Sequence, residues 1–427
     1  MSLLSSLFSG WSGLRINSLE LSVVGDNIAN ANTIGFKGSR AEFEEALAQT
    51  VIGSGQVGMG AGLQTVHRIL SQGALMSTGQ PTDLALQGPG FFMVKGAHNG
   101  VDGTFYTRAG QFTLDQDGYL VNHDGLRVQG YSADGAGNVA SSLGDLHLGD
   151  APSPPRATSE ITLKANLQAD AAPPTLPFDP NDPEATSNFN TSVTVYDSLG
   201  KAHDVQVYFR KNTDGQWEWH ALTDGGGLQG GAAGVATEIA SGALSFDGEG
   251  RLVDATQTSN FNPAGATGPQ PLSFNFGDPL NAGGTGLEGI TQFAATSEVR
   301  FMDQDGYTSG TLAMVQINEQ GMIMGTFSNG ETRALGQVAV ADFSAPEQLS
   351  RAGGNLYTVT GGSGAPTVGA PGSGGRGSVA AGALEQSNVD LAAEFIRMIS
   401  AQRGFQANSK TISTADQLLG ELMQLKR

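Results

Sequence analysis

The stretch LAAEFIRMISAQRGFQANSKTISTADQLLGELM, residues 391–423, repeats an apolar side chain every seven residues. The repeat consists of Leu391, Met398, Phe405, Ile412 and Leu419, with Phe395 and Met423 at a companion position. Such a stripe predicts an amphipathic helix with a coiled-coil seam. Ser387 and Asn388 are candidate N-caps, and Asp390 and Glu394 lie early, where the helix dipole favours anions.

The amino end has the same pattern in LLSSLFSGWSGLRINSLELSVVGDNI, residues 3–28. Its seam consists of Leu7, Leu14, Leu21 and Ile28, with Leu4 and Trp11 at the alternating position. Burial against the protein's own core is the simpler explanation of one such stripe. A strict seven-residue apolar repeat at both termini instead favours seams that pack against other copies of the chain. We therefore interpret the four seam residues of the amino end and the five of the carboxyl end as polymerisation contacts.

Between the two ends, short alternating apolar runs separated by Gly-rich turns predict β-strands. They are GFFMV (90–94), TRAGQFTLDQDGYLV (107–121), TSVTVYD (191–197), VQVYFRKNTDGQWEWHAL (205–222) and RALGQVAVADF (333–343). Asp-Gly at 117–118, 124–125, 214–215, 247–248 and 305–306 predicts five hairpin tips, and LDQDGYL (114–120) and MDQDGYT (302–308) look like one hairpin written twice. The predicted fold class is a mainly β multidomain protein with nested β domains and a terminal α-helical coiled-coil domain formed by both chain ends.

Pro-rich stretches at 151–160 and 169–188 and a Gly-rich stretch at 361–378, expected to be extended and flexible, mark the internal boundaries. They predict four regions. These are a helical core domain (1–33 and 384–427), a connecting region (34–80 and 361–383), an inner β domain (81–154 and 299–360) and an outer β domain (155–298).

Composition limits the partners of this 427-residue chain. With 22 basic and 41 acidic residues its formal charge is −19, which opposes binding to nucleic acid. Residues 151–299 carry 17 acidic and 6 basic groups, a net −11, whereas the two ends are nearly neutral. We therefore expect the acidic region to face solvent and the helices to face partners. The sequence contains no run of 18 apolar residues, so we expect no helix that inserts into a membrane. No cleavable signal peptide is visible.

Three motifs resemble functional sites but are incomplete. GSGQVG (53–58) has the letters of a dinucleotide fingerprint, but it follows the helix-like AEFEEALAQ (41–49) rather than a strand, so we expect a flexible linker. DQDG at 115–118 and 303–306 lacks the remaining calcium ligands, so hairpin turns are favoured. The six histidines show no ligand spacing, the chain has no Cys, and no nucleophile elbow occurs. We predict no catalytic, cofactor or metal site, and no enzyme.

The chain resembles the bacterial flagellar rod and hook protein family in NIANANTIGFK (27–37), whose motif residues are Asn27, Asn30, Asn32, Gly35, Phe36 and Lys37. The resemblance continues in GPGFFMV, YTRAGQFTLDQDGYLVN and GLRVQGY between 88 and 131. It returns in FSNGETRALGQVAVADFSAPEQLSRAGGNLY (327–357), EQSNVDL (385–391) and QRGFQANSK (402–410). The large insert at 151–299 favours a hook subunit over a distal rod protein.

This resemblance implies a structural subunit of the flagellar hook. Such subunits polymerise into a curved hollow tube that acts as a universal joint between rod and filament. The implied partners are further copies of the chain, the distal rod protein, and the hook cap and hook–filament junction proteins. The resemblance also implies export through the flagellar type III apparatus without a cleaved signal peptide, and an extracellular location in the flagellum. GSGQVGMGAG (53–62) is a candidate hinge. The alternatives are a distal rod protein of the same family, a secreted β-rich adhesin, and an enzyme.

Overall fold

The computed structural model describes residues 3–47, 58–149 and 152–425, and its contacts divide the chain into two compact units. The larger unit contains residues 1–151, 313–326 and 332–427, and the smaller one contains residues 152–312 and 327–331. The smaller unit is therefore inserted into the sequence of the larger one. The finer division of the larger unit into helical, connecting and inner β regions stays a prediction.

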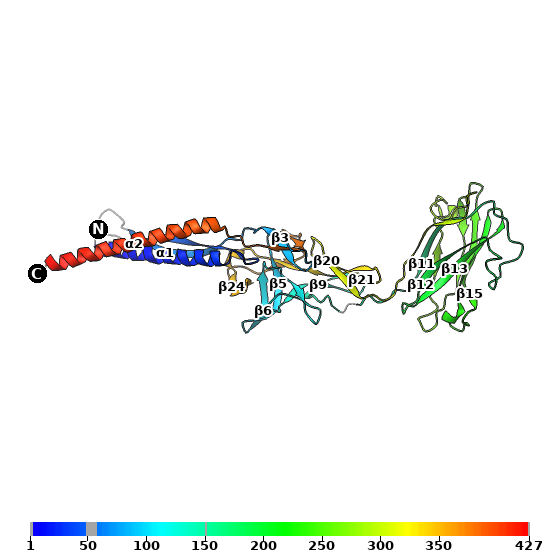
Figure 1. Ribbon diagram of the computed structural model, residues 1–427, viewed down its shortest axis with the longest axis horizontal. Coiled ribbons are helices and arrows are strands. Elements are labelled where there is room, and N and C mark those ends of the chain that lie inside the picture. Colours follow the sequence, from blue (N-terminus) through cyan, green and yellow to red (C-terminus); the bar gives the residue numbers. More distant parts are fainter. Residues whose placement is uncertain (1–2, 48–57, 150–151, 426–427) are drawn as a thin grey trace. The chain divides into compact units, whose positions relative to one another are not determined.

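The two chain ends form helices α1 (Leu3–Ala29) and α2 (Leu391–Leu425), which lie side by side in Figure 1. The N-cap of α2 is Asp390, whose carboxylate accepts hydrogen bonds from the N–H groups of Ala392 and Ala393 at 2.9 and 3.3 Å. The expected caps Ser387 and Asn388 were wrong. The Asn388 side chain cannot cap because it is engaged elsewhere, where its Oδ1 accepts from the Gly38 N–H.

After α1 the chain forms an antiparallel hairpin of β1 (Ser39–Leu47) and β2 (Gly58–Arg68). The helix-like interpretation of residues 41–49 was therefore wrong for the described part of that segment. Ala and Glu favour helices by only tenths of a kcal/mol per residue, and backbone pairing with β2 outweighs that preference. Residues 53–57, most of the fingerprint-like segment and half of the proposed hinge, lie outside the described residues.

The main sheet of the larger unit has 13 strands among the described residues. Along its path lie β20 (Leu312–Ile317), β21 (Met322–Phe327), β22 (Thr332–Val338), β9 (Arg127–Ala133), β5 (Phe91–His98), β6 (Val101–Thr107), β25 (Leu356–Thr358) and β24 (Ser350–Gly353). Branching from it are β7 (Thr113–Leu114), β8 (Leu120–Val121), β10 (Val139–Asp145), β23 (Val340–Asp342) and β26 (Thr367–Gly369). Two short ladders pair β27 (Ser378–Ala381) with β4 (Leu84–Gln87), and β28 (Ala383–Glu385) with β3 (Leu75–Ser77).

Part of the core of the larger unit is an aromatic cluster on this sheet. Phe91 packs edge-on against Phe343 and Tyr357, with ring centroids 6.0 and 5.7 Å apart. Phe91 lies in one predicted strand, and Phe343 ends another about 250 residues further along the chain. The aromatic cluster therefore joins two segments that are distant in the sequence. The inserted sequence between them leaves this core intact.

The smaller unit consists of two sheets. The first contains β12 (Phe189–Tyr196), β13 (Ala202–Thr213), β14 (Gln216–Asp224), β15 (Ala236–Phe246) and β16 (Leu252–Ala255), with β17 (Thr258–Ser259) beside β15. The second contains β18 (Ser273–Asn275), β11 (Glu160–Asn166) and β19 (Glu298–Gln304). Alternate residues of β13 and β14 are buried, among them Phe209, Trp217 and Trp219, so the period of two in the sequence forms the core face.

Four of the five Asp-Gly pairs lie in turns between antiparallel strands, as predicted. The pair at 305–306 does not, so the idea of one hairpin written twice was wrong. The strand before it, β19, pairs with β11 instead of with the strand that follows. The Asp305 carboxylate accepts from the N–H groups of Ser159 and Glu160 at 2.7 and 3.0 Å, which ties it to β11.

The Gly-rich stretch 361–378 consists of turns on either side of the short strand β26, and hydrogen bonds hold it within the larger unit, which corrects the expectation of an extended, flexible connector. Its strand β26 pairs with β23, and the Gly377 N–H donates to the Pro89 carbonyl oxygen at 2.7 Å. Ser363 within it is fully buried. The many glycines therefore permit close packing here rather than free movement.

A buried Asp197 closes the turn between β12 and β13. Its Oδ1 accepts from the N–H groups of Leu199 and Lys201, and its Oδ2 lies 3.1 Å from His203 Nε2. Burial by itself raises the pKa of Asp197, but the hydrogen bonds from His203 and from the two N–H groups outweigh it and leave the pKa lowered. The folded smaller unit therefore favours the ionised carboxylate.

We predict that Asp197→Asn removes a part of the acid sensitivity of the smaller unit. A lowered folded pKa contributes stability above the unfolded value of about 4 and loses it as pH falls through the folded pKa. The wild-type chain should lose more stability than the variant below pH ~4. Tryptophan fluorescence in urea measures this, because two of the three tryptophans lie in this core. Equal acid sensitivity of the two chains would contradict the prediction.

Candidate functional site

Small residues and asparagines form the contact between α1 and α2. Asn17 donates to the Gly13 carbonyl oxygen on α1, and Asn408 donates to the Gly404 carbonyl oxygen on α2. Each asparagine faces the other helix's glycine: a Cβ placed on Gly13 would lie 2.5 Å from Asn408 Nδ2, and one on Gly404 would collide with Asn17. This pairing makes the helices antiparallel. A larger residue at either glycine would have to displace the facing asparagine side chain.

The predicted seam flanks this contact instead of filling its centre. Val24, Ala401 and Ala415 are buried, 4% exposed or less. The half-buried seam residues are Leu7, Leu14, Leu21, Ile28, Met398, Ile412 and Leu419, and the exposed ones are Leu391 and Phe405. The side chains of Leu4 and Met423 lie outside the described residues. Large apolar groups therefore remain accessible on the helical pair, and their role as a polymerisation seam stays a proposal.

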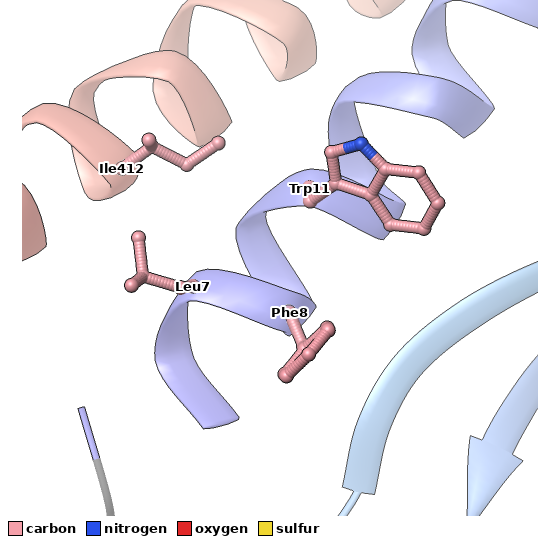
Figure 2. A pocket seen from close by; sticks show the side chains of 4 residues that line it. All are labelled: Leu7, Phe8, Trp11 and Ile412. Carbon is pink, nitrogen blue, oxygen red and sulfur yellow. The ribbon is translucent and has the colours of Figure 1, made fainter. Parts of the chain in front are cut away.

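An apolar hollow of about 430 Å³ opens beside α1 (Figure 2). Leu7, Phe8, Trp11 and Ile412 line it. In Figure 2, Leu7 lies toward Ile412 of α2, whereas Phe8 and Trp11 lie on the other side of α1. Phe8 and Trp11 are 53% and 58% exposed, a large exposure for aromatic side chains. Since each ring is already about half covered, burying the rest against a partner would be favourable by roughly 1 to 1.5 kcal/mol for each ring, half of the value for a fully exposed side chain.

The motif at 27–37 joins α1 to the β structure. The buried Asn27 side chain bonds both the N–H and the carbonyl oxygen of Ser39, at 2.9 and 2.8 Å. The Asn30 side chain donates a hydrogen bond to the Asp26 carbonyl oxygen at the end of α1, whereas Asn32 is exposed. Gly35 has a φ of +70°, and a Cβ there would lie 2.5 Å from the Ala109 nitrogen, so this position requires glycine.

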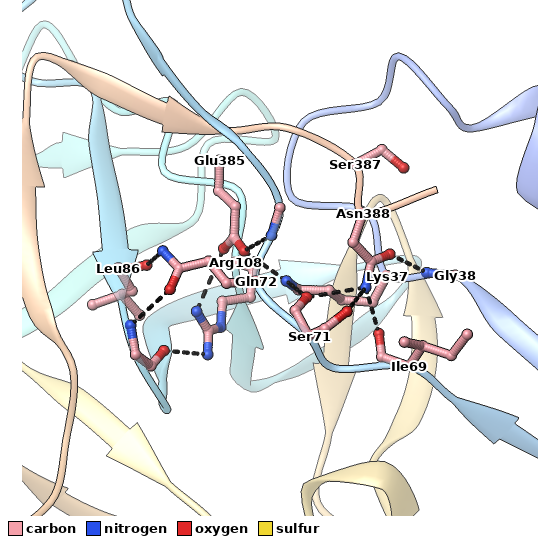
Figure 3. A network of polar contacts seen from close by, with 12 residues as sticks. Lys37, Gly38, Ile69, Ser71, Gln72, Leu86, Arg108, Glu385, Ser387 and Asn388 are labelled. Carbon is pink, nitrogen blue, oxygen red and sulfur yellow. Dashed lines mark hydrogen bonds and ion pairs between the residues drawn. The ribbon is translucent and has the colours of Figure 1, made fainter. Parts of the chain in front are cut away.

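The last motif residues meet the carboxyl-terminal segment in a buried cluster of charges (Figure 3). Lys37 Nζ lies 2.6 Å from Glu385 Oε1, and Arg108 Nη1 lies 3.4 Å from Glu385 Oε2. Lys37 and Glu385 are both fully buried, and the Gly73 N–H also donates to Glu385 Oε1. Burial lowers the pKa of the Lys37 ammonium, and the hydrogen bond and charge of Glu385 oppose that shift. Burial also lowers the pKa of Arg108.

Two further side chains close this junction. Asn388 accepts from the Gly38 N–H and donates to the carbonyl oxygens of Ile69 and Ser71 (Figure 3). Arg351 donates to the Lys37 carbonyl oxygen, and its guanidinium lies 5.3 Å from the centre of the buried Phe36 ring. The junction therefore fixes where both helices leave the β structure.

Sequence reasoning missed Gly13 and Gly404, as well as Arg108 and Arg351. The glycines had a usable signal, because glycine inside an otherwise helical pattern commonly marks a close approach. The two arginines had none, since nothing local distinguishes a buried arginine from an exposed one. Among the described residues, no group of three or more His, Asp or Glu is placed to hold a metal ion.

Four family models match the chain in order. They are the flagella basal body rod protein (9–37), the flagellar hook protein FlgE/F/G D1 domain (85–169), the flagellar basal body protein FlaE D2 domain (166–307) and the flagellar basal body rod FlgEFG protein C-terminal region (380–425). The first and last coincide with the helices and the junction. Full-length relatives decide the assignment.

The chain is 35% identical to the flagellar hook protein FlgE of Treponema pallidum, with both chains fully covered. It is 37% identical to that of Borreliella burgdorferi (99% of this chain, 100% of the relative) and 33% identical to that of Escherichia coli (97% and 98%). The chain belongs to the flagellar hook protein family. This family is structural and not enzymatic.

A solved structure of the Helicobacter pylori flagellar hook protein FlgE2 aligns with 71% of this chain and 98% of its own, at 17% identity and a TM-score of 0.48. Within the part of the chain that the structure describes, neither helix is long and apolar enough to cross a membrane. The mainly β fold class with packed terminal helices is confirmed.

We predict that Lys37→Met destabilises the larger unit by about 3–5 kcal/mol, because it breaks a buried ion pair around Glu385. Loss of far-UV circular dichroism in urea measures the helical pair at this junction. The matched control is Arg40→Met, which breaks the exposed Arg40–Glu42 pair and should change stability far less. Equal losses of stability in the two variants would contradict the prediction that the buried cluster stabilises the fold more than an exposed ion pair does.

Proposed function

We propose that this chain polymerises into the curved hollow tube of the flagellar hook, a universal joint that transmits torque from rod to filament. Its membership of the hook protein family supports a polymer within the flagellum. The observation that carries the proposal in this chain is the set of large apolar side chains left exposed on a helical pair. Trp11, Phe395, Ile399 and Phe405 are 39–58% exposed, which a monomer in water disfavours.

The charge distribution supports the same assembly. The helical segments are nearly neutral, whereas residues 151–299 carry a net −11, so repulsion is weakest where the apolar side chains are exposed. In the tube, the helical pairs would keep the wall continuous through apolar contacts. The polar surfaces of the β units could exchange partners as the tube rotates around its bend.

The remaining parts of the proposal concern partners and location. The tube would join the distal rod protein at one end and the hook–filament junction proteins at the other, with the hook cap at its growing tip. Subunits would reach the extracellular part of the flagellum through the type III export apparatus, without a cleaved signal peptide. These assignments rest on the family resemblance.

Electron microscopy of the purified chain tests the polymer, with curved tubes as the expected result. We predict that Phe405→Asp prevents tube formation, because a carboxylate in an apolar contact is costly to desolvate. The matched control is Gln406→Asp, which adds the same charge one residue away at another exposed position. Straight rods from the wild-type chain would favour a distal rod protein, and no polymer at all would favour an adhesin.

A second prediction concerns the smaller unit, which we propose lies at the outer radius of the tube. The backbones of Ser153 and Gly310 exchange two hydrogen bonds, at 2.9 and 3.0 Å, so a short Gly-Ser link can replace residues 154–309 there. The shortened chain should still form tubes but with altered curvature. Complete loss of tubes from a shortened chain with normal helical circular dichroism would contradict the prediction.

A further inference from the structure

Two Asn-Gly dipeptides occur in the sequence, at 99–100 and 329–330. In such a pair the backbone nitrogen of the glycine can attack the side-chain carbonyl carbon of the asparagine, and glycine leaves that nitrogen unshielded because it has no side chain. Both pairs lie between antiparallel strands, the first between β5 and β6 and the second between β21 and β22. The two pairs are alike in sequence but differ in their surroundings.

Asn99 and Gly100 form the two-residue tip of the β5–β6 hairpin. Their φ angles are +50° and +78°, as in a type I′ turn. Both residues are exposed, and a Cβ placed on Gly100 would meet no atom within 4 Å. Among the described residues, the Asn99 amide has one partner, the Ala352 carbonyl oxygen at 3.4 Å, and the Gly100 N–H has no acceptor. The groups that would react are therefore accessible and weakly held.

The turn that contains Asn329 and Gly330 is held by hydrogen bonds at the same groups. Asn329 Nδ2 donates to the Thr308 carbonyl oxygen at 2.8 Å and to Ser153 Oγ at 3.3 Å. The Gly330 N–H donates to the Phe327 carbonyl oxygen at 3.0 Å. Both the nitrogen that would attack and the amide that would leave are therefore bound, although the dipeptide is the same.

We propose that Asn99 is a site of spontaneous deamidation in the folded chain, and that Asn329 is protected from this reaction. The Gly100 nitrogen forms a bond to Cγ of Asn99, and the bond from Cγ to Nδ2 breaks. Ammonia leaves with the proton of the Gly100 nitrogen, and a succinimide ring remains. Water then opens the ring. Its addition at Cγ gives an aspartate, and its addition at the backbone carbonyl carbon gives an isoaspartate.

The reaction changes the hairpin tip in two ways. A carboxylate at position 99 cannot donate to the Ala352 carbonyl oxygen, so the tip loses this bond to β24. An isoaspartate also adds a CH₂ group to the backbone, which a two-residue type I′ loop does not accommodate. The inference does not depend on the proposed function, because the reaction needs only water and the folded single chain.

Incubation of the purified full-length chain in warm neutral buffer tests the proposal. Samples taken over time are digested, and mass spectrometry measures aspartate and isoaspartate at positions 99 and 329 above the level at time zero. Asn329 must first break its bond to Thr308, and Gly330 its bond to Phe327, so position 329 should convert at least about tenfold more slowly than position 99. In urea, where the chain is unfolded, the two positions should convert at similar rates.

The matched control is Asn99→Gly, because two glycines also favour a type I′ turn and no amide remains to leave. Its tip peptide should gain no acid, whereas conversion at Asn329 should be unchanged. Equal rates at the two positions in the folded chain would overturn the protection of Asn329. Conversion of Asn99 in urea without conversion in the folded chain would overturn the proposed site.

Discussion

The buried cluster around Glu385 is the constraint on which the arrangement of this chain depends. A fully buried carboxylate is costly unless cations and N–H groups compensate it, and here Lys37, Arg108 and the Gly73 N–H do so. These partners come from three separate segments of the first 110 residues, whereas Glu385 ends β28, the last strand before α2. The cluster thus brings the two chain ends together, so the β structure between them begins and ends at the same junction.

The size of the residues at the helix contact explains why the helical pair is suited to assembly. Gly13 and Gly404 leave room for the Asn408 and Asn17 side chains at the centre of the contact, and the larger apolar side chains lie at its flanks. The apolar residues of the heptads, such as Phe395 and Phe405, consequently remain half exposed. A helical pair that buried its largest residues internally would have little left to offer another copy. In this chain the internal contact and the external surface use different residues.

Periodicity predicted much of the fold, because both helix and strand patterns are local. The sevens at the two ends and the alternation that buries Trp217 and Trp219 were sufficient for the elements that contain them. The errors arose where distant partners decided the outcome. Residues 41–47 form a strand because β2 pairs with them. Asp305 does not lie in the predicted hairpin turn, because its carboxylate accepts hydrogen bonds from the N–H groups of Ser159 and Glu160 at the start of β11.

The sequence by itself determined the secondary structure of the long periodic segments, the absence of cysteine chemistry and the likeness of residues 27–37 to a family motif. It also indicated that the ends are neutral and the insert acidic. Only the tertiary structure decided which face of each helix is internal, that Lys37 is a buried ion-pair partner, and that Phe395 and Ile399 of α2 are left exposed. The physical reason is that period and charge are properties of neighbouring residues, whereas burial depends on which distant segments supply matching shape and hydrogen-bond partners.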